Sequence, residues 1–316
     1  MQNLILKARR LAIDAEQAQQ RLDNFLFREL KGVPKGHVYR LLRTGQVRVN
    51  GRRTKPDYRL ESGDEVRIPP VRQAETPPPA RPGSRQQAAL QDAILFEDDQ
   101  LLVINKPAGI AVHGGSGVSF GIIEALRILR PEQRYLELVH RLDRDTSGCL
   151  VIAKKRSALR FLHAGLREGA VEKQYVALLA GHWRGGERHV CLALEKNMLQ
   201  SGERRVRVTE AGKQAESTFK PVQAFKDATL VEVTIMTGRT HQIRVHAAHL
   251  KHPVLGDDKY GDRQANRTFR SLGLKRMFLH ARSLGFRHPV SAEAMLVSAP
   301  LDDNLKTVLD RLEQEA

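Results

Sequence analysis

Apolar residues near the N-terminus of the chain predict two helices followed by strands. A helix is predicted over residues 21–31, because its apolar positions recur three or four residues apart: Leu22, Phe25, Leu26 and Leu30. A second helix is predicted from Pro34, with an apolar face formed by Val38, Leu41 and Leu42. Residues 46–53 then alternate as a strand does and contain Asn50-Gly51, a strong hairpin signal, and residues 64–68 predict a further strand.

No apolar period continues into residues 71–90, which are rich in Pro, Gln and Ala and include Pro77-Pro78-Pro79. Such a composition is typical of a linker that is semi-rigid at its proline run and flexible elsewhere. A chain of 316 residues is long enough for two domains. The sequence therefore predicts a small domain over residues 1–70, the linker, and a large domain over residues 91–316.

The large domain mixes helix and strand patterns without regular alternation. Strands are predicted over four apolar runs: residues 101–104, 149–153, 174–181 and 230–236. Helices are predicted over residues 122–129, 157–168 and 241–250 and in a last segment capped by Asp302. Residues 184–218 are basic and less periodic, and we expect them to be peripheral. This order predicts an α+β fold with a mixed, largely antiparallel sheet flanked by helices.

The net charge of the chain indicates which class of partner it binds. Lys and Arg number 52 against 36 Asp and Glu, a formal charge of +16, which favours nucleic acid over other partners. A soluble protein with a solvated basic face is the alternative. Cys149 and Cys191 give neither a disulfide framework nor paired metal spacing. No apolar run reaches the roughly 18 residues of a membrane span, and no signal-peptide core is present, so we expect a cytoplasmic protein.

Candidate chemistry concentrates in residues 138–153. Residues 140–147 contain two acids, two arginines, one histidine and two hydroxyls, and the chain then enters an apolar strand. Residues 145–147 could bond their own backbone in a turn closed by Gly148. Such a turn leaves three polar residues without a role: His140, Arg141 and Asp143.

The run His140-Arg141-Leu142-Asp143-Arg144-Asp145-Thr146-Ser147-Gly148 resembles the catalytic signature of the RluA-type pseudouridine synthases. Supporting blocks at residues 103–109, 172–175 and 237–244 extend the resemblance to roughly residues 91–300. Within that family the chain is most similar to the enzymes of large-subunit ribosomal RNA. The resemblance implies a mixed sheet crossed by a cleft, and isomerisation of uridine to pseudouridine in ribosomal RNA without a cofactor or metal.

The resemblance also implies roles for single residues. Asp143, and not Asp145, would be the essential carboxylate. Tyr175 would stack on or orient the uracil and could act as a base, and Arg244 would pair with Asp143. The remaining candidates would contact the RNA: His140, Arg141, Arg239 and His241, with Arg239 also a weaker candidate for the ion pair. From the residues alone, Tyr175 could instead be a core aromatic, and both Arg239 and Arg244 could contact phosphate without a catalytic role.

Residues 21–68, two short helices followed by a basic hairpin, resemble an S4 RNA-binding domain. Basic residues recur along this segment, as a surface that contacts phosphates requires: Lys31, Lys35, Arg40, Arg43, Arg48, Arg52 and Arg53. A merely solvated face is the alternative interpretation. The linker would let this domain move relative to the larger one.

Other interpretations remain open at this point. The acids Asp143 and Asp145 also resemble the start of a phosphoaspartate phosphatase, although there the motif ends an apolar strand. A non-enzymatic S4-containing RNA-binding factor would keep its function on loss of Asp143. Three histidines follow one another at intervals of three residues: His246, His249 and His252. On a regular helix their side chains cannot converge on one metal ion, so we do not expect a metal site there. We expect a monomer.

Overall fold

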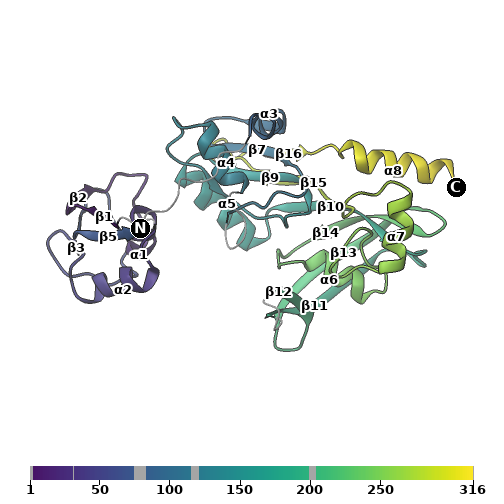
Figure 1. The fold of residues 1–316 in the computed structure, drawn as a ribbon, viewed down its shortest axis with the longest axis horizontal. Coiled ribbons are helices and arrows are strands. Elements are labelled where there is room, and N and C mark those ends of the chain that lie inside the picture. Colours follow the sequence, from purple (N-terminus) through teal and green to yellow (C-terminus); the bar gives the residue numbers. More distant parts are fainter. Residues whose placement is uncertain (1–2, 31, 75–82, 115–120, 199–203, 316) are drawn as a thin grey trace. The chain divides into compact units, whose positions relative to one another are not determined.

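The computed structural model describes residues 3–30, 32–74, 83–114, 121–198 and 204–315. The chain divides into two compact units, Met1–Ala80 and Arg81–Ala316 (Figure 1). Lys31 and residues 75–82 of the predicted linker lie outside the described residues.

The smaller unit packs two helices and two small sheets around one core. Its elements are β1 (Asn3–Leu6), β2 (Arg9–Ala12), α1 (Leu22–Glu29), α2 (Lys35–Arg43), β3 (Arg48–Val49), β4 (Glu65–Ile68) and β5 (Val71–Ala74). The apolar positions predicted on α1 and α2 are buried. The strands form an antiparallel sheet in the order β2-β4-β3 and a separate β1-β5 pair. Asn50 and Gly51 have φ values of 51° and 76°, which supply the predicted two-residue turn.

The larger unit is built on one 11-stranded sheet in the described part of the chain. Its strands are β6 (Ile94–Glu97), β7 (Leu101–Lys106), β8 (Glu137–Leu138), β9 (Ser147–Ala153), β10 (Glu172–Ala180), β11 (Arg188–Met198), β12 (Arg204–Val208), β13 (Lys213–Ala224), β14 (Ala228–Ile235), β15 (Leu279–Arg287) and β16 (Ala294–Ser298). The order is β12-β11-β13-β14-β10-β15-β9-β7-β6, with β16 paired to β15 and β8 to β9. Among these described strands only the β9–β15 pair is parallel, which confirms the predicted α+β fold with a mixed, largely antiparallel sheet.

Helices cover both faces of this sheet. They are α3 (Ser84–Asp92), α4 (Ile122–Leu129), α5 (Arg156–Glu168), α6 (Gln242–His249), α7 (Arg263–Ser271) and α8 (Asp303–Gln314). Because successive strand residues point to opposite faces, Leu102 in β7 packs in one core with α4 and α6, whereas Leu101 packs with α5. On β10, Tyr175 belongs to the α4 and α6 face and Val176 to the face covered by α8.

Several predicted elements are confirmed. Helix α4 spans the predicted residues, and Asp302 caps α8 by accepting a hydrogen bond from Leu305 N at 3.0 Å. Helices α5 and α6 and strands β7, β9, β10 and β14 lie within a few residues of their predicted positions.

Two segments contain regular elements that the sequence did not predict. The predicted linker over residues 71–90 contains β5 and most of α3. Strand β5 is held by a four-residue pairing with β1, and α3 buries Leu90, which is 2% exposed. Neither element requires a repeating apolar pattern, so no pattern in the sequence indicated them. Within residues 184–218, which we expected to be peripheral, the chain forms β11, β12 and the start of β13, and these strands lie at one edge of the main sheet. The buried side of β13 carries Ala215, Ser217 and Phe219, of which only Phe219 is a strong hydrophobic signal in the sequence.

Candidate active site

A tight turn between β8 and β9 carries Asp143. Thr146 N donates to Asp143 O at 3.2 Å just before β9 begins. Gly148 in β9 has a φ of 111°, and a Cβ there would lie 2.2 Å from the Ala281 oxygen of the parallel strand β15. Glycine therefore permits the close β9–β15 approach that brings Asp143 beside Leu279 of β15.

Two cations hold the carbonyl groups of this turn. Lys106 is 0% exposed, and its Nζ donates to three backbone carbonyl oxygens at 2.7–3.0 Å, one of them that of Arg144. Burial lowers the pKa of Lys106 to about 7, although the negative charges of Asp145 and Asp143 act in the opposite direction. Arg276 Nη1 donates to Asp145 O at 3.3 Å. The backbone on the C-terminal side of Asp143 is therefore fixed from two directions.

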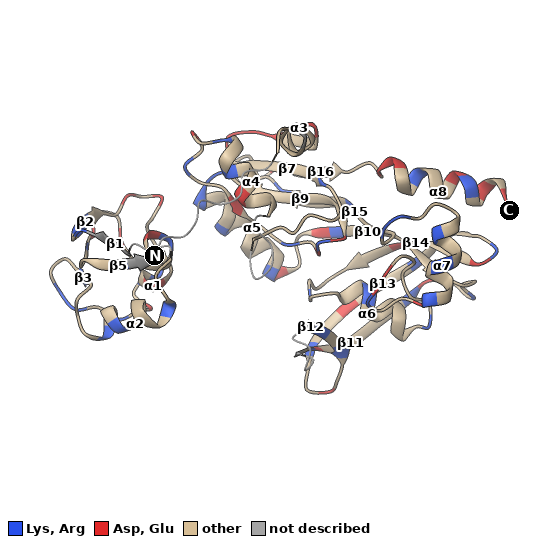
Figure 2. Cartoon of the chain, in the orientation of Figure 1, with Lys and Arg blue, Asp and Glu red and all other residues tan. Residues whose placement is uncertain are grey.

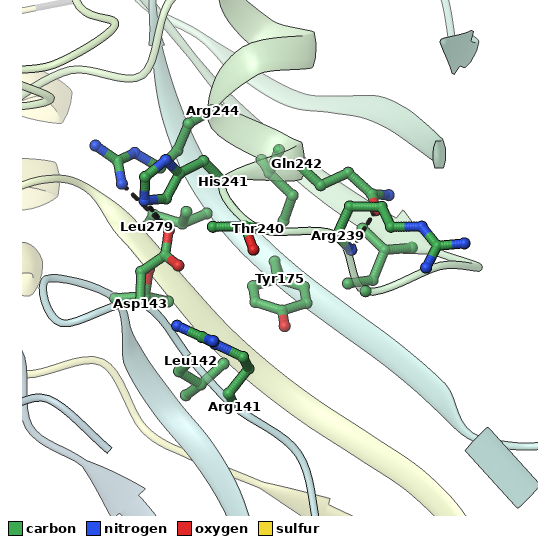
Figure 3. Close-up of a pocket in the computed structure, with 14 residues that line it drawn as sticks. Arg141, Leu142, Asp143, Tyr175, Arg239, Thr240, His241, Gln242, Arg244 and Leu279 are labelled. Atoms are coloured by element: carbon green, nitrogen blue, oxygen red, sulfur yellow. Dashed lines mark hydrogen bonds and ion pairs between the residues drawn. The ribbon is translucent and has the colours of Figure 1, made fainter. Parts of the chain in front are cut away.

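Arg244 on α6 is shared by two acids. Its Nη1 donates to Asp143 Oδ2 at 3.2 Å (Figure 3). Its Nε and Nη2 donate to Asp257 Oδ2 and Oδ1 at 2.7 and 2.8 Å. Burial disfavours the ionised form of Asp257, but the hydrogen bonds and charge of Arg244 outweigh it and lower the pKa of Asp257. The same two ion pairs overcome burial and raise the pKa of Arg244, so its guanidinium stays charged.

His241 caps α6 in the left-handed conformation, with a φ of 53°, a strained backbone that is often found at functional sites. Its Nδ1 lies 2.8 Å from the Tyr260 hydroxyl oxygen, which accepts a hydrogen bond from Val206 N at 2.8 Å. The Tyr260 proton can then be donated to Nδ1, which leaves Nε2–H of the neutral ring 3.9 Å from Asp143 Oδ2. Burial lowers the pKa of His241 and so favours this neutral ring.

Asp143 lies where a cavity of about 60 Å³ meets a cleft of about 840 Å³. The apolar walls of the cavity are Leu142, Tyr175, Ile235, Ile243 and Leu279. Among the described residues, none donates a hydrogen bond to Asp143 Oδ1. One carboxylate oxygen is therefore paired and the other is available to a ligand.

Tyr175 reaches this cavity from β10, where the pairing with β15 shifts register between Gln174 and Tyr175. Irregularities of this kind re-aim side chains beside active sites. Burial, followed by the negative charge of Asp143, raises the pKa of Tyr175. The hydroxyl group therefore stays protonated, and the ring forms a wall of the cavity (Figure 3).

The other candidates differ in their placement. Arg141 is exposed and lines both the cavity and the cleft. Arg239 lines the cavity, but its Nε donates to Gln214 O at 3.1 Å and its guanidinium is directed away from Asp143 (Figure 3). His140 lines neither space, because its Nε2 accepts a hydrogen bond from Val151 N at 3.1 Å.

Asp145 does not line the cavity, although it lines the adjoining cleft. Its carboxylate is 42% exposed and accepts from Arg144 Nε and Nη2 at 3.0 and 3.2 Å. The structure thus brings six predicted residues to the lining of the cavity: Arg141, Asp143, Tyr175, Arg239, His241 and Arg244.

The basic residues predicted on the smaller unit are exposed. They are Lys35, Arg40, Arg43, Arg48, Arg52 and Arg53, and Figure 2 shows basic residues along α2. Arg53 Nη2 donates to Arg43 O, and Arg48 donates to Gly45 O and Gly51 O at 3.3 Å. Within the described residues none of the six pairs with an acid, so the end of α2 and the following turn form one unneutralised basic surface.

Three supporting residues escaped the sequence analysis as site residues: Lys106, Asp257 and Tyr260. Asp257 follows the apolar pair Val254-Leu255 and Gly256, and a buried acid in such surroundings requires a cation or several donors. That signal indicates a buried acid but does not identify its partner. Tyr260 gave no sequence signal.

The described residues offer neither a metal site nor a membrane span. No group of three or more His, Cys, Asp or Glu residues among them is placed to hold a metal ion. No helix in the same parts of the chain is long and apolar enough to cross a membrane.

A partly buried carboxylate with an arginine partner, beside a mixed sheet, agrees with the pseudouridine synthases that the sequence resembles. The chain belongs to the RNA pseudouridylate synthase family, whose profile matches residues 100–249, and residues 20–66 match the S4 domain. It is 57% identical over 305 residues to the Ribosomal large subunit pseudouridine synthase C of Escherichia coli (strain K12), a match that covers 96% of each chain. A protein of the same name from Salmonella typhi is 57% identical over 309 residues, 97% of each chain.

A solved structure supports the same assignment. Human RNA Pseudouridylate Synthase Domain Containing 4 superposes with a TM-score of 0.61 at 28% identity, covering 72% of this chain and 96% of that one. Both resemblances drawn from the sequence, to the pseudouridine synthases and to the S4 domain, are confirmed.

Proposed function

We propose that this chain converts uridines of large-subunit ribosomal RNA to pseudouridine, with Asp143 as the reacting carboxylate. One observation carries the role of Asp143: its Oδ2 is paired with Arg244 at 3.2 Å, while its Oδ1 has no donor among the described residues, and Asp143 lines a cavity that has both apolar and polar walls. The class of RNA comes from the names of the bacterial relatives, which match along 96% of the chain.

The reaction breaks the N1–C1′ bond, turns the uracil and joins C5 to C1′, with neither net redox change nor hydrolysis. A carboxylate suits this work because it can add to the sugar or base, or remove the C2′ proton. These paths remain alternatives. The reacting atoms are hidden while the base is stacked, so the nucleotide must be flipped out of its strand. We propose that the base enters the cavity while the strand occupies the adjoining cleft.

The surrounding residues have complementary roles in this proposal. The exposed guanidinium of Arg141, at the border of cavity and cleft, suits contact with the flipped nucleotide or a phosphate. The Tyr175 ring provides a flat wall against the uracil, and its raised pKa speaks for orientation rather than for a phenolate base. His241 Nε2–H is a donor directed to the reacting carboxylate. Arg239 and His140 are less favourably placed, and an RNA contact by either stays a prediction.

Incubation with unmodified RNA tests the function. Large-subunit ribosomal RNA transcribed in vitro, and the same RNA partly assembled with ribosomal proteins, would be incubated with the chain and mapped for pseudouridine. We expect modification at a small number of uridines. A folded chain that forms no pseudouridine in either substrate would overturn the proposal.

We further propose that the smaller unit binds RNA phosphates without taking part in the chemistry. Replacing Arg43, Arg48 and Arg53 by Ala should weaken RNA binding. It should also reduce the slope of log K against log salt by about 0.7 to 0.9 for each phosphate that the variant no longer neutralises. Arg10→Ala is the control, because Arg10 lies in the same unit but pairs with Glu65 at 3.2 Å. An unchanged slope in the triple variant would contradict the proposal. The chain is proposed to act as a monomer, which sedimentation would test.

Two alternatives lose support. A phosphoaspartate phosphatase has its paired acids at the end of a strand, whereas Asp143 precedes β9 and Asp145 pairs with Arg144 at the surface. A non-enzymatic RNA-binding factor is disfavoured because the chain belongs to a family of enzymes.

A further inference from the structure

Asp257 is an acid with no exposure to solvent and a complete set of hydrogen bonds. Its side chain is 0% exposed. Oδ1 accepts from Lys259 N at 2.8 Å, from Tyr260 N at 3.1 Å and from Arg244 Nη2 at 2.8 Å, and Oδ2 accepts from Arg244 Nε at 2.7 Å. A carboxylate bound in this way cannot rotate without breaking several of these bonds.

The backbone around Asp257 is held equally firmly. Asp257 O accepts from Asn266 Nδ2 at 3.0 Å and from Gly261 N at 2.9 Å, and Gly256 N donates to Asn266 Oδ1 at 2.8 Å. The carboxylate is therefore mounted on a fixed turn that follows α6, the helix that carries Arg244.

The two bonds to Asp257 determine the plane of the Arg244 guanidinium. Two parallel N–H···O bonds to one carboxylate fix the orientation of a guanidinium group, whereas a single hydrogen bond lets the group rotate about that bond. The Tyr260 ring lies on the same guanidinium, with its centroid 5.0 Å from Cζ. Of the three guanidinium nitrogens, Nη1 is left for Asp143, and it meets only Oδ2 of that acid.

Without Asp257, Arg244 would be free to turn its fork onto Asp143. A two-bond pair with Asp143 would occupy both of its oxygens, including Oδ1, which the reaction needs. By taking two of the three nitrogens, Asp257 keeps the pair with Asp143 to a single bond.

We propose that Asp257 is a positioning residue for the pseudouridine reaction: it holds Arg244 so that one oxygen of Asp143 is paired and the other stays open to the substrate. The inference rests on the proposed role of Asp143. Asp257 does not touch the substrate in this account and acts through Arg244 alone.

The test uses Asp257→Asn in the full chain. Asn has the same shape as Asp, and its side-chain oxygen can still accept hydrogen bonds. Its NH2 group, however, would face an N–H donor of Arg244, so the second bond that orients the guanidinium would be lost. We expect kcat to fall about 100-fold, the order of loss that a misplacement of about 1 Å causes, with KM for RNA changed less than about twofold. Asp303→Asn is the control, because that side chain is exposed, lines neither the cavity nor the cleft and should leave kcat within about twofold.

A second pair of variants separates positioning from folding. Arg244→Met and the double variant Arg244→Met with Asp257→Asn would be compared in single-turnover assays with enzyme in excess, and the double variant removes the buried charge of Asp257. If Asp257 acts through Arg244, the second substitution should not slow the reaction further. This comparison decides the matter if Asp257→Asn alone does not fold.

Three results would overturn the inference: a folded Asp257→Asn with kcat within about threefold of the unaltered chain, an effect confined to KM, or a double variant much slower than Arg244→Met. Asp143→Asn, assayed in parallel, isolates the underlying proposal. An active Asp143→Asn would contradict the proposed function, whereas an inactive Asp143→Asn beside a fully active Asp257→Asn would contradict only the inference about Asp257.

Discussion

Replacing Arg244 by Met would leave Asp143 and Asp257, two carboxylates of the candidate active site, without their shared cation. The Asp257 side chain is 0% exposed and the Asp143 side chain 18% exposed, so water can replace the guanidinium only in part. Removing one partner of a buried ion pair costs about 3 to 5 kcal/mol, because the other charge remains buried and unpaired. For a domain of this size, each kcal/mol lowers Tm by about 2 to 4 °C, so we expect a decrease of roughly 6 to 20 °C.

Thermal and urea unfolding of the full chain at pH 7 would measure this loss. Arg282→Met is the control, because Arg282 is 54% exposed and pairs with Glu232 at 3.0 Å; an exposed pair of this kind contributes less than about 1 kcal/mol. Adding Asp257→Asn to Arg244→Met should restore much of the stability, because it removes a buried charge. A loss below about 1 kcal/mol in Arg244→Met, or a double variant no more stable than the single one, would refute the reasoning.

Three further predictions follow from the geometry. Tyr175→Phe should keep kcat within about tenfold while Tyr175→Ala loses more than about 100-fold, because the ring forms the cavity wall; a Phe variant as slow as the Ala variant would instead assign the hydroxyl a proton-transfer role. Burial lowers the pKa of His246 to about 4, so the unfolded chain binds a proton between about pH 6.5 and 4 that the folded chain does not. The free energy of unfolding should therefore fall by about 3 kcal/mol on account of His246 as the pH falls from 6.5 to 4. In a His246→Met variant, the free energy of unfolding should lack this decrease with pH. Gly148→Ala should destabilise the chain strongly by forcing β9 from β15, where its Cβ would lie 2.2 Å from Ala281 O, whereas Gly109→Ala, at a φ of 84° with open space, should cost only about 1 to 2 kcal/mol in the same unfolding assay.

The sequence predicted those elements whose burial is apolar and periodic. Helix α4 spans the predicted residues, and α8 begins at its predicted cap, because each buries a stripe of Leu, Ile or Val. Strand β13 was missed since its inward positions include Ala215 and Ser217. Strand β15 was also missed, although it lies next to the turn that carries Asp143. Its inward residues include the 0% exposed His280, whose ring is held by Ser147 and by the Ala299 carbonyl, so its burial depends on hydrogen bonds rather than on hydrophobicity.

The candidate site was predictable where a contiguous motif carried it. Asp143, Arg141 and Arg244 lie at one cavity, as a match of nine consecutive residues and a second block implied. His140 belongs to the same motif, yet its ring accepts a hydrogen bond from β9, an interaction that depends on how the chain turns. Asp257 and Tyr260 lie in a separate turn, and only the folded chain shows that they hold Arg244 and His241.

The most direct test of the account compares two nearly isosteric changes in the same turn, Asp143→Asn and Asp145→Asn. Each folded variant would be incubated with large-subunit ribosomal RNA, and pseudouridine would be measured site by site, with RNA binding measured separately. Because Asp143 borders the cavity while Asp145 pairs with Arg144 at the surface, we predict that Asp143→Asn binds RNA but forms no pseudouridine, and that Asp145→Asn keeps substantial activity. An active Asp143→Asn beside an inactive Asp145→Asn would contradict the central claim.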